Sequence, residues 1–188
     1  MKFILNFLFF LSVSCFVQAQ KLSLNKRVAI SSLNAKAKET VGNIRVYSNG
    51  SKVTVDDASF TATEMGVKID VVVVNASGSK TTFTSEFNPA NITYIKDHEL
   101  PDKSPVGQML ISLDYKIGYN TAYHKKSGLS RSYEDEVVFN FLQVDEDNFL
   151  EIQTALFKLR DLYTEEENGP LKPLSKVMSR TQDFWMSS

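Results

Sequence analysis

Cysteine is almost absent from this chain, which has one among its 188 residues. That residue, Cys15, lies in the apolar N-terminal stretch, so the remainder of the chain contains no thiol and forms no disulfide. A domain without cross-links depends on its hydrophobic core for stability, and this chain is long enough to bury one.

An excess of either charge is missing as well. The 21 lysines and arginines and the 22 acidic residues give a formal net charge of −1 at pH 7. Nucleic-acid binding needs a basic surface that neutralises phosphates, and this composition does not supply one. We therefore expect no nucleic acid among the partners.

Recognisable catalytic motifs are also lacking. The sequence contains neither a Gly-x-Ser-x-Gly elbow nor a His-Glu-x-x-His helix. Its two histidines are His98, between Asp97 and Glu99, and His124. Neighbouring side chains of an extended chain point apart, so the surroundings of His98 are typical of an ordinary loop. We expect no catalytic residue, no metal ligand and no cofactor.

Three acids near residue 150 raise the alternative of a calcium site. Asp145, Asp147 and Glu151 supply oxygen ligands, but an EF-hand loop counted from Asp145 needs glycine at its sixth position and an acid at its twelfth. Leu150 and Leu156 stand at those positions. The acids are better explained as the start of a helix, where the helix dipole favours negative charge.

The N-terminus has the pattern of a secretory signal peptide over residues 1–19. Lys2 precedes an apolar run from Phe3 to Leu11, and the stretch ends in Val17-Gln18-Ala19. The run is too short to span a bilayer, so a cleaved signal is favoured over a membrane anchor. This predicts a secreted or periplasmic protein with no stable membrane span. Lipidation at Cys15 is the alternative. It is less favoured because the lipidation pattern has a leucine-like residue three positions before the cysteine, where this chain has Ser12.

Two local patterns follow the signal segment. Ile30, Leu33 and Ala37 recur at helical spacing within residues 27–41, and Gly42 follows as a C-terminal cap, which predicts a short amphipathic helix. Asn49-Gly50 then lies between two strand-like runs, residues 44–48 and 51–55. This pair is typical of a two-residue type I′ hairpin turn.

From residue 56 to residue 144 the sequence is strand-like, with turn residues at short intervals. We expect antiparallel strands at residues 58–63, 67–75, 80–87, 92–96, 109–123 and 133–144. In the run 109–123, Ile111 and Leu113 share their parity with Tyr115, Tyr119 and Tyr123, which predicts one long strand with a buried face and a bend near Gly118.

A long amphipathic helix is predicted to start near Asn148, with Glu151 completing a capping box. Its apolar positions cover more than half of its circumference, so it must pack across the sheet. They are Phe149, Ile152, Leu156, Leu159 and Tyr163, with Leu150 and Phe157 on one flank. Residues 164–188 are expected to form a linker and a C-terminal tail, in which Leu174, Val177, Met178 and Trp185 have the spacing of a possible short helix.

These elements predict one α+β domain over residues 20–163. We expect a mainly antiparallel sheet or partly open barrel of about seven strands, with an N-terminal helix and a long C-terminal capping helix. This order resembles the pleckstrin-homology superfold, and residues 137–163, the last strand and its helix, carry the resemblance. Inositide-binding members use a basic cluster in their first hairpin, where this chain has only Arg45 and Lys52. The Phe-rich signal and the Val-Val-Phe-Asn-Phe-Leu-Gln strand also resemble small secreted proteins of bacteria.

Three functions from different classes are compatible with this sequence. The first is a non-enzymatic binding or scaffolding module that holds a protein partner through a sheet edge or through Leu150 and Phe157. The second is a carrier of a small apolar or sugar-like ligand in a cavity between sheet and helix. That cavity would be lined by Tyr115, Tyr119, Tyr123, Phe149, Ile152 and Leu156. The third is a hydrolase that uses His98 or His124.

The signal-peptide hypothesis predicts that the exported protein begins at Gln20. Intact-mass analysis of the exported protein checks this directly, because cleavage after Ala19 fixes the mass. A mass that corresponds to a lipid-modified Cys15 contradicts it.

Overall fold

A computed structural model describes residues 23–98, 104–114, 118–124, 128–143, 145 and 147–168. For residues 118–124, 128–131 and 133 it describes the backbone alone. The expected signal segment with Cys15, the expected strand position Tyr115 and the tail after Asn168 lie outside the described residues.

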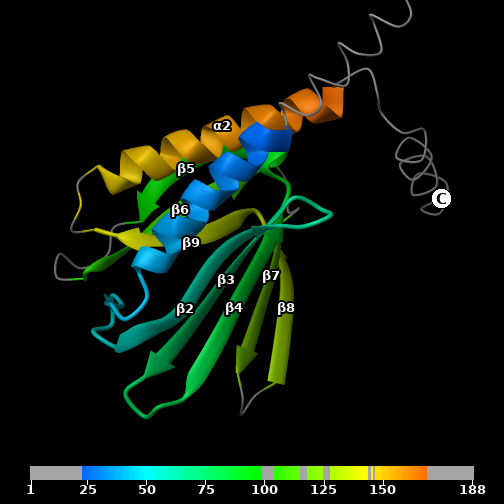
Figure 1. Cartoon of the computed structure of the whole chain (residues 1–188). Helices are drawn as coiled ribbons and strands as arrows, with labels where there is room; N and C mark the ends of the chain where they lie inside the picture. Colours follow the sequence, from blue (N-terminus) through cyan, green and yellow to red (C-terminus); the bar gives the residue numbers. More distant parts are fainter. Residues whose placement is uncertain are drawn as a thin grey trace, which may run out of the picture.

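Two antiparallel sheets and two helices make up the described fold (Figure 1). The larger sheet has the strand order β1-β2-β3-β4-β7-β8, and the smaller has the order β5-β6-β9. The N-terminal helix covers residues 23–39. The other elements are β1 (Ile44–Val46), β2 (Lys52–Ala62), β3 (Val67–Asn75), β4 (Lys80–Phe87), the 3-10 helix η1 (Pro89–Asn91), β5 (Ile92–His98), β6 (Val106–Leu113), β7 (Gly118–His124), β8 (Gly128–Glu134), β9 (Glu136–Leu142) and α2 (Asn148–Asn168).

The predicted fold class is confirmed, because the described chain is α+β with antiparallel sheets, an N-terminal helix and a long C-terminal helix. The two sheets do not close into a barrel through any described strand pairing. Nine strands are described instead of about seven. β2 runs continuously through a bulge between Val55 and Asp57, where two strands were expected.

The single strand expected over residues 109–123 is wrong. β6 ends at Leu113 in the smaller sheet, whereas β7 starts at Gly118 in the larger one. At the break, Asp114 leaves the ladder and donates its N–H to the carbonyl oxygen of Asn91 (2.8 Å). Alternation continues in the sequence across this point, so parity alone could not reveal that the chain changes sheets.

The hairpin at Asn49-Gly50 is present, but its turn differs from the expected type. The N–H of Gly50 donates to the carbonyl of Tyr47 (2.8 Å), which makes a three-residue loop with Gly50 in the left-handed region at φ 79°. The hairpin between β3 and β4 has the same geometry, with Gly78 at φ 78°. In such a loop the required positive φ falls at the third position, where glycine stands in both hairpins.

One hydrophobic core lies between the two sheets and beneath the two helices. Phe60 of the larger sheet and Phe139 of the smaller have their ring centroids 5.9 Å apart, which joins the sheets. Ile152, Leu156 and Leu159 of α2 are at most 1% exposed within the same cluster. α2 therefore closes the core, as its wide apolar arc predicted.

Gly107 in β6 leaves the space that an aromatic ring of the neighbouring strand fills. Gly107 and Phe141 are directly opposite in the β6–β9 pairing. A Cβ atom at Gly107 would lie 2.8 Å from the ring of Phe141. Phe141 in turn packs on Phe149 of α2, with ring centroids 6.0 Å apart. The missing side chain thus allows Phe141 to lie flat over β6 and to support the helix.

Side chains occupy backbone groups at several strand edges. Asn34 of the N-terminal helix accepts from the Phe60 N–H (3.0 Å), and Gln153 of α2 donates to the Ile95 carbonyl (3.3 Å). The next two bonds act in the same way. Asn148 donates to the Leu142 carbonyl (3.0 Å), and Ser104 accepts from the Val46 N–H (3.1 Å). Each bond satisfies a polar group that another strand could otherwise use.

Packing of α2 on the sheets predicts a large difference between two leucines of this helix. Leu156 is fully buried, so Leu156→Ala should lower the free energy of unfolding by about 2–5 kcal/mol through lost burial and the cavity left behind. Leu150 is 62% exposed, and Leu150→Ala should change it by less than about 0.5 kcal/mol. Urea unfolding of both variants beside the parent provides the test. Equal midpoints for the two variants would mean that α2 does not pack as described.

Candidate binding groove

The two helices lie antiparallel and side by side on the outside of the core (Figure 1). Lys36 lies near the end of the N-terminal helix, and its ammonium nitrogen is 2.9 Å from a carboxylate oxygen of Glu151 near the start of α2. Lys26, near the beginning of the N-terminal helix, forms an ion pair with Glu166 near the end of α2. Contacts at both ends hold the spacing between the helices.

A groove with a volume of about 630 Å³ runs between the outer faces of these helices. Its most exposed apolar side chains are Val28 at 59% and Leu150 at 62%. Leu24, one turn before Val28, is 52% exposed. The groove is lined by Val28, Ala29, Ser32, Asp147, Leu150, Glu151, Thr154, Ala155 and Lys158.

The charges of the groove are unevenly placed. Asp147 and Glu151 lie near the start of α2, whereas Lys158 lies two turns further along the helix. Lys36 faces the acidic end, and its hydrogen bond to Glu151 raises the pKa of the lysine above its ordinary value, against the opposing effect of burial. The acidic end is therefore partly neutralised by a lysine that stays protonated.

The capping box expected from Asn148 and Glu151 is wrong in detail. The Asn148 side chain is buried and accepts from the Lys36 ammonium group (2.5 Å). Asp145 forms a turn just before the helix, since its carboxylate accepts from the Asp147 N–H (3.2 Å). Asn148 is buried between the helices and the end of β9, so its amide makes tertiary bonds in place of a local one.

Leu150 and Phe157 were expected to share one partner surface, and the structure places them differently. Leu150 lines the groove. Phe157 does not line it, packs partly against the core, and has the Arg160 guanidinium 4.8 Å from its ring centroid. The other large exposed apolar side chain of the groove is Val28 on the N-terminal helix, which the sequence analysis did not single out. Its position at one side of a helix whose opposite side carries Leu33 and Ala37 was the available signal.

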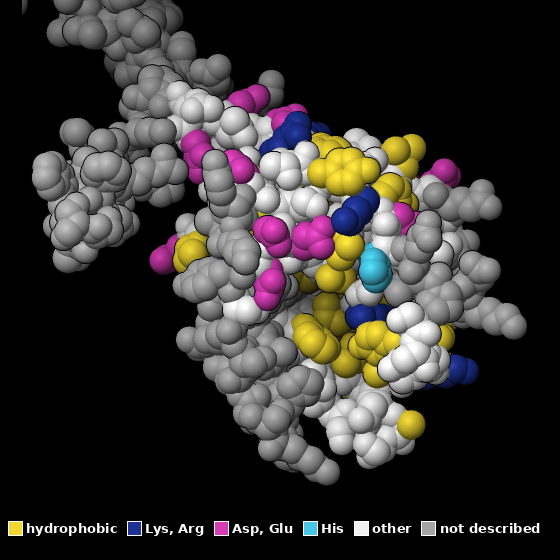
Figure 2. Space-filling model, turned by 180° about the vertical axis from the view of Figure 1, so that it is seen from behind, with side chains coloured by type: hydrophobic (Ala, Val, Ile, Leu, Met, Phe, Trp, Pro, Cys, Tyr) yellow, Lys and Arg dark blue, Asp and Glu magenta, His cyan; other side chains and the backbone are white. Residues whose placement is uncertain are grey.

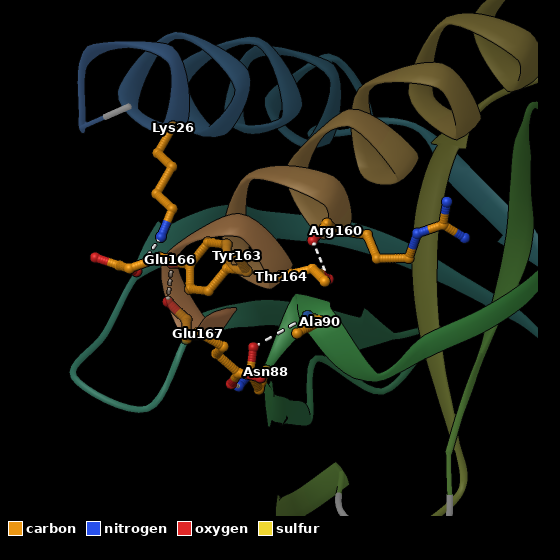
Figure 3. Close-up of polar contacts among 9 residues, drawn as sticks. Lys26, Asn88, Ala90, Arg160, Tyr163, Thr164, Glu166 and Glu167 are labelled. Atoms are coloured by element: carbon orange, nitrogen blue, oxygen red, sulfur yellow. Dashed lines mark hydrogen bonds and ion pairs between the residues drawn. The ribbon is translucent and has the colours of Figure 1, made fainter. Parts of the chain in front are cut away.

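The far end of the helix pair is fixed by a cluster of Lys26, Tyr163 and Glu166 (Figure 3). The Lys26 ammonium group lies 3.6 Å from the centroid of the Tyr163 ring while it pairs with Glu166. The Tyr163 hydroxyl donates to the Gly66 carbonyl (2.9 Å). Burial raises the pKa of Tyr163, and the nearby Glu166 charge adds to the effect.

Gly66 is required at this end of the molecule for steric reasons. Its φ of 147° is one that other residues rarely adopt, and a Cβ atom there would lie 2.4 Å from the Phe87 carbonyl oxygen. The turn at Gly66 can therefore approach β4 closely and still present its carbonyl to Tyr163.

α2 continues to Asn168, whereas residues 164–168 were expected to belong to a linker. The change to a polar, acidic composition after Tyr163 predicted that linker, and acids in the last turn of a helix are unfavourable next to the negative end of its dipole. Partners far away in the sequence compensate here. Lys26 pairs with Glu166, and the Asn88 side chain donates to Glu167 (2.6 Å) while it also caps η1 at Ala90 (Figure 3).

The residues proposed to line a ligand cavity are not gathered at one site. Ile152 and Leu156 are fully packed within the core, and Phe149 packs against it. Tyr119 pairs with Glu86 and Tyr123 with Thr82 in the larger sheet, and their side chains are not among those described. Tyr115 lies outside the described residues.

Neither histidine stands at the groove. His98 is the exposed last residue of β5 in the smaller sheet, and His124 is the last residue of β7 in the larger one. Within the described ranges, no group of three His, Cys, Asp or Glu side chains could hold a metal ion. Arg45 of the first hairpin is half-buried, with its guanidinium 4.3 Å from the centroid of the Tyr47 ring, and desolvation lowers its pKa.

Apolar side chains are also exposed elsewhere on the molecule. Figure 2 shows hydrophobic side chains, in yellow, on the face opposite to the one seen in Figure 1. They are Val41, Ile44, Met65, Phe83, Tyr94 and Val138. A second hollow of about 370 Å³ lies on β1, β2 and β3, between Ile44 and Ala76. It has only one well-exposed large apolar residue, Ile44, so the groove between the helices offers the stronger apolar contact.

Comparison of the chain with protein-family models, with curated proteins and with solved structures gives no significant match. Neither described helix has both the length and the hydropathy that a bilayer span requires. A functional assignment for this chain therefore rests on its own geometry.

The cluster at the end of α2 predicts local fraying when Lys26 is altered. Lys26→Met keeps an apolar stem over Tyr163 but removes the charge that offsets the terminal acids, so amides of residues 164–168 should exchange with solvent faster. Amides of residues 152–160 should be unchanged, because the core holds them. Lys38→Met, at an exposed position of the same helix, is the matched control in hydrogen-exchange measurements. Identical exchange in the two variants would contradict the role given to Lys26.

Proposed function

We propose that this protein is a non-enzymatic binding module that works outside the cytoplasm and holds a protein partner in the groove between its two helices. The observation that supports this most is the pair Val28 and Leu150, two large apolar side chains more than half exposed on the two walls of one groove. Large apolar side chains gathered in an exposed hollow are typical of a recognition surface.

The groove is held by rigid elements, which favours recognition without prior reorganisation. Ala29 and Ala155 form its floor and are buried or half-buried beside the core. The ion pairs of Lys26 and Lys36 fix the helices at both ends. A preformed surface loses little conformational entropy when a partner binds.

A sheet edge is the less favoured surface for a partner. Strand addition needs unpaired backbone N–H and C=O groups along an edge. Asn34, Gln153, Asn148 and Ser104 already occupy such groups on β2, β5, β9 and β1. The helix groove has no comparable obstruction among the described contacts.

The dimensions of the groove indicate the kind of partner. A volume of about 630 Å³ accommodates a few side chains of one segment, in the manner of an amphipathic helix laid into a groove. The acids Asp147 and Glu151 favour a segment with a basic residue at that end, and Lys158 favours an acid at the other.

The carrier and the hydrolase receive less support from the described residues. A carrier needs an open cavity beside the residues of α2 that face the sheets, and Ile152 and Leu156 are packed tightly there. A hydrolase needs a base oriented by a neighbouring group, and His98 is exposed at the end of a strand.

Site-specific photo-cross-linking in the producing cells tests the proposal. A photoreactive residue in place of Leu150 should give a discrete cross-linked protein product, whereas the same residue in place of Met65 should not. Met65 is 69% exposed and apolar, so it matches Leu150 in chemistry but lies away from the groove. Val28→Asp should reduce the product formed at position 150. Equal products at both positions, or none at position 150, would count against a partner site in the groove.

A further inference from the structure

We propose that residues 173–185 of the same chain, which follow α2, bind in the groove between the helices until a partner displaces them. This regulation rests on the proposed function of the groove. The segment carries Leu174, Val177, Met178 and Trp185 at helical spacing, which is the pattern that a groove lined by Val28 and Leu150 would accept.

The point from which this segment departs is fixed. Contacts of Lys26 with Glu166 and of Asn88 with Glu167 hold the last turn of α2 against the rest of the fold (Figure 3). Gly169 and Pro170 follow directly, and these residue types end a helix and allow the chain to turn back. A tail that starts from this fixed point stays within reach of the groove.

Distances along the chain match this arrangement. α2 rises about 15 Å from Lys158, at one end of the groove, to its last residue Asn168. Residues 169–172 reach about 14 Å when extended, which returns residue 173 to the level of Lys158. A helix over residues 173–185 would be about 20 Å long, and the groove extends about 17 Å along α2 from Lys158 to Asp147.

This alignment also places Arg180 and Trp185 at defined positions along the groove. With residue 173 beside Lys158, Arg180 falls about level with Glu151 and Trp185 about level with Asp147, at the end of the groove that contains Leu150. Asp147 is exposed and belongs to the acidic end. Lys176 falls about level with Ala155 and Asp183 about level with Asn148, so Arg180 alone of the tail charges meets an opposite charge. The antiparallel direction follows from the reach of the chain, because the segment starts at the end of α2 and must run back along it.

An intramolecular occupant also has an advantage over a free one. A tether of this length gives an effective concentration on the order of millimolar, so even weak contacts fill the groove most of the time. A partner must then bind the groove more tightly than it would need to if the tail were absent. A single weak apolar segment of another protein would therefore not displace the tail.

The only tryptophan of the chain, Trp185, reports directly on this contact. In the full exported protein its fluorescence should resemble that of a shielded indole, with an emission maximum at short wavelength and weak quenching by acrylamide. Leu150→Asp should shift the emission to longer wavelength and strengthen quenching, whereas Met65→Asp should do neither. Circular dichroism and urea midpoints equal to those of the parent show that each variant is folded.

Each outcome of this experiment decides the proposal. Identical Trp185 spectra in the parent and both variants overturn it, and so does an equal shift with Met65→Asp. A short-wavelength emission that is lost on dilution means that the tail of a second copy fills the groove, which overturns the intramolecular contact. If a partner is cross-linked at position 150 but the Trp185 emission does not shift, the proposed function stands and the tail contact is rejected. If the Trp185 emission shifts but no partner is cross-linked, the tail contact stands and the proposed function is rejected.

Discussion

The burial of one side of α2 is the interaction on which the rest of this structure depends. Each sheet presents an apolar face that water would otherwise reach, and neither sheet closes on itself. Ile152, Leu156 and Leu159 close the shared core where α2 packs on β5 and β9 of the smaller sheet, and the Phe60–Phe139 contact joins that sheet to the larger one. Because the chain has a single cysteine and cannot form an internal disulfide, this shared core has no covalent cross-link to support it. The groove between the helices exists only because α2 is held in this place.

Features that depend on local periodicity could be predicted from the sequence. The buried positions Leu33, Ala37, Ile152 and Leu156 follow directly from helical spacing, and Gly42 takes the left-handed conformation expected of a cap. The antiparallel class followed from short connections between strand-like runs. Such predictions succeed because each pattern and the element that it forms lie within the same few residues.

Features that depend on distant partners could not be predicted in this way. The last turn of α2 is helical against its own acids because Lys26 and Asn88, far away in the sequence, contact Glu166 and Glu167. The change of sheet after β6 is equally non-local. For the candidate site, the sequence singled out Leu150 but missed Val28, since the pairing of two helices is not visible in either helix alone.

The pairing of Lys26 with Glu166 has a further consequence for how the domain can be attached to something else. It brings the first turn of the N-terminal helix and the last turn of α2 to the same corner of the fold (Figure 1). A fusion partner or a solid support joined directly to residue 23 or to residue 168 would therefore hold the molecule in nearly the same orientation, with the tip of the β3–β4 hairpin directed away. Neighbouring ends of this kind are also those that a short linker can join, so the chain is suited to circular permutation with new ends opened at a hairpin loop.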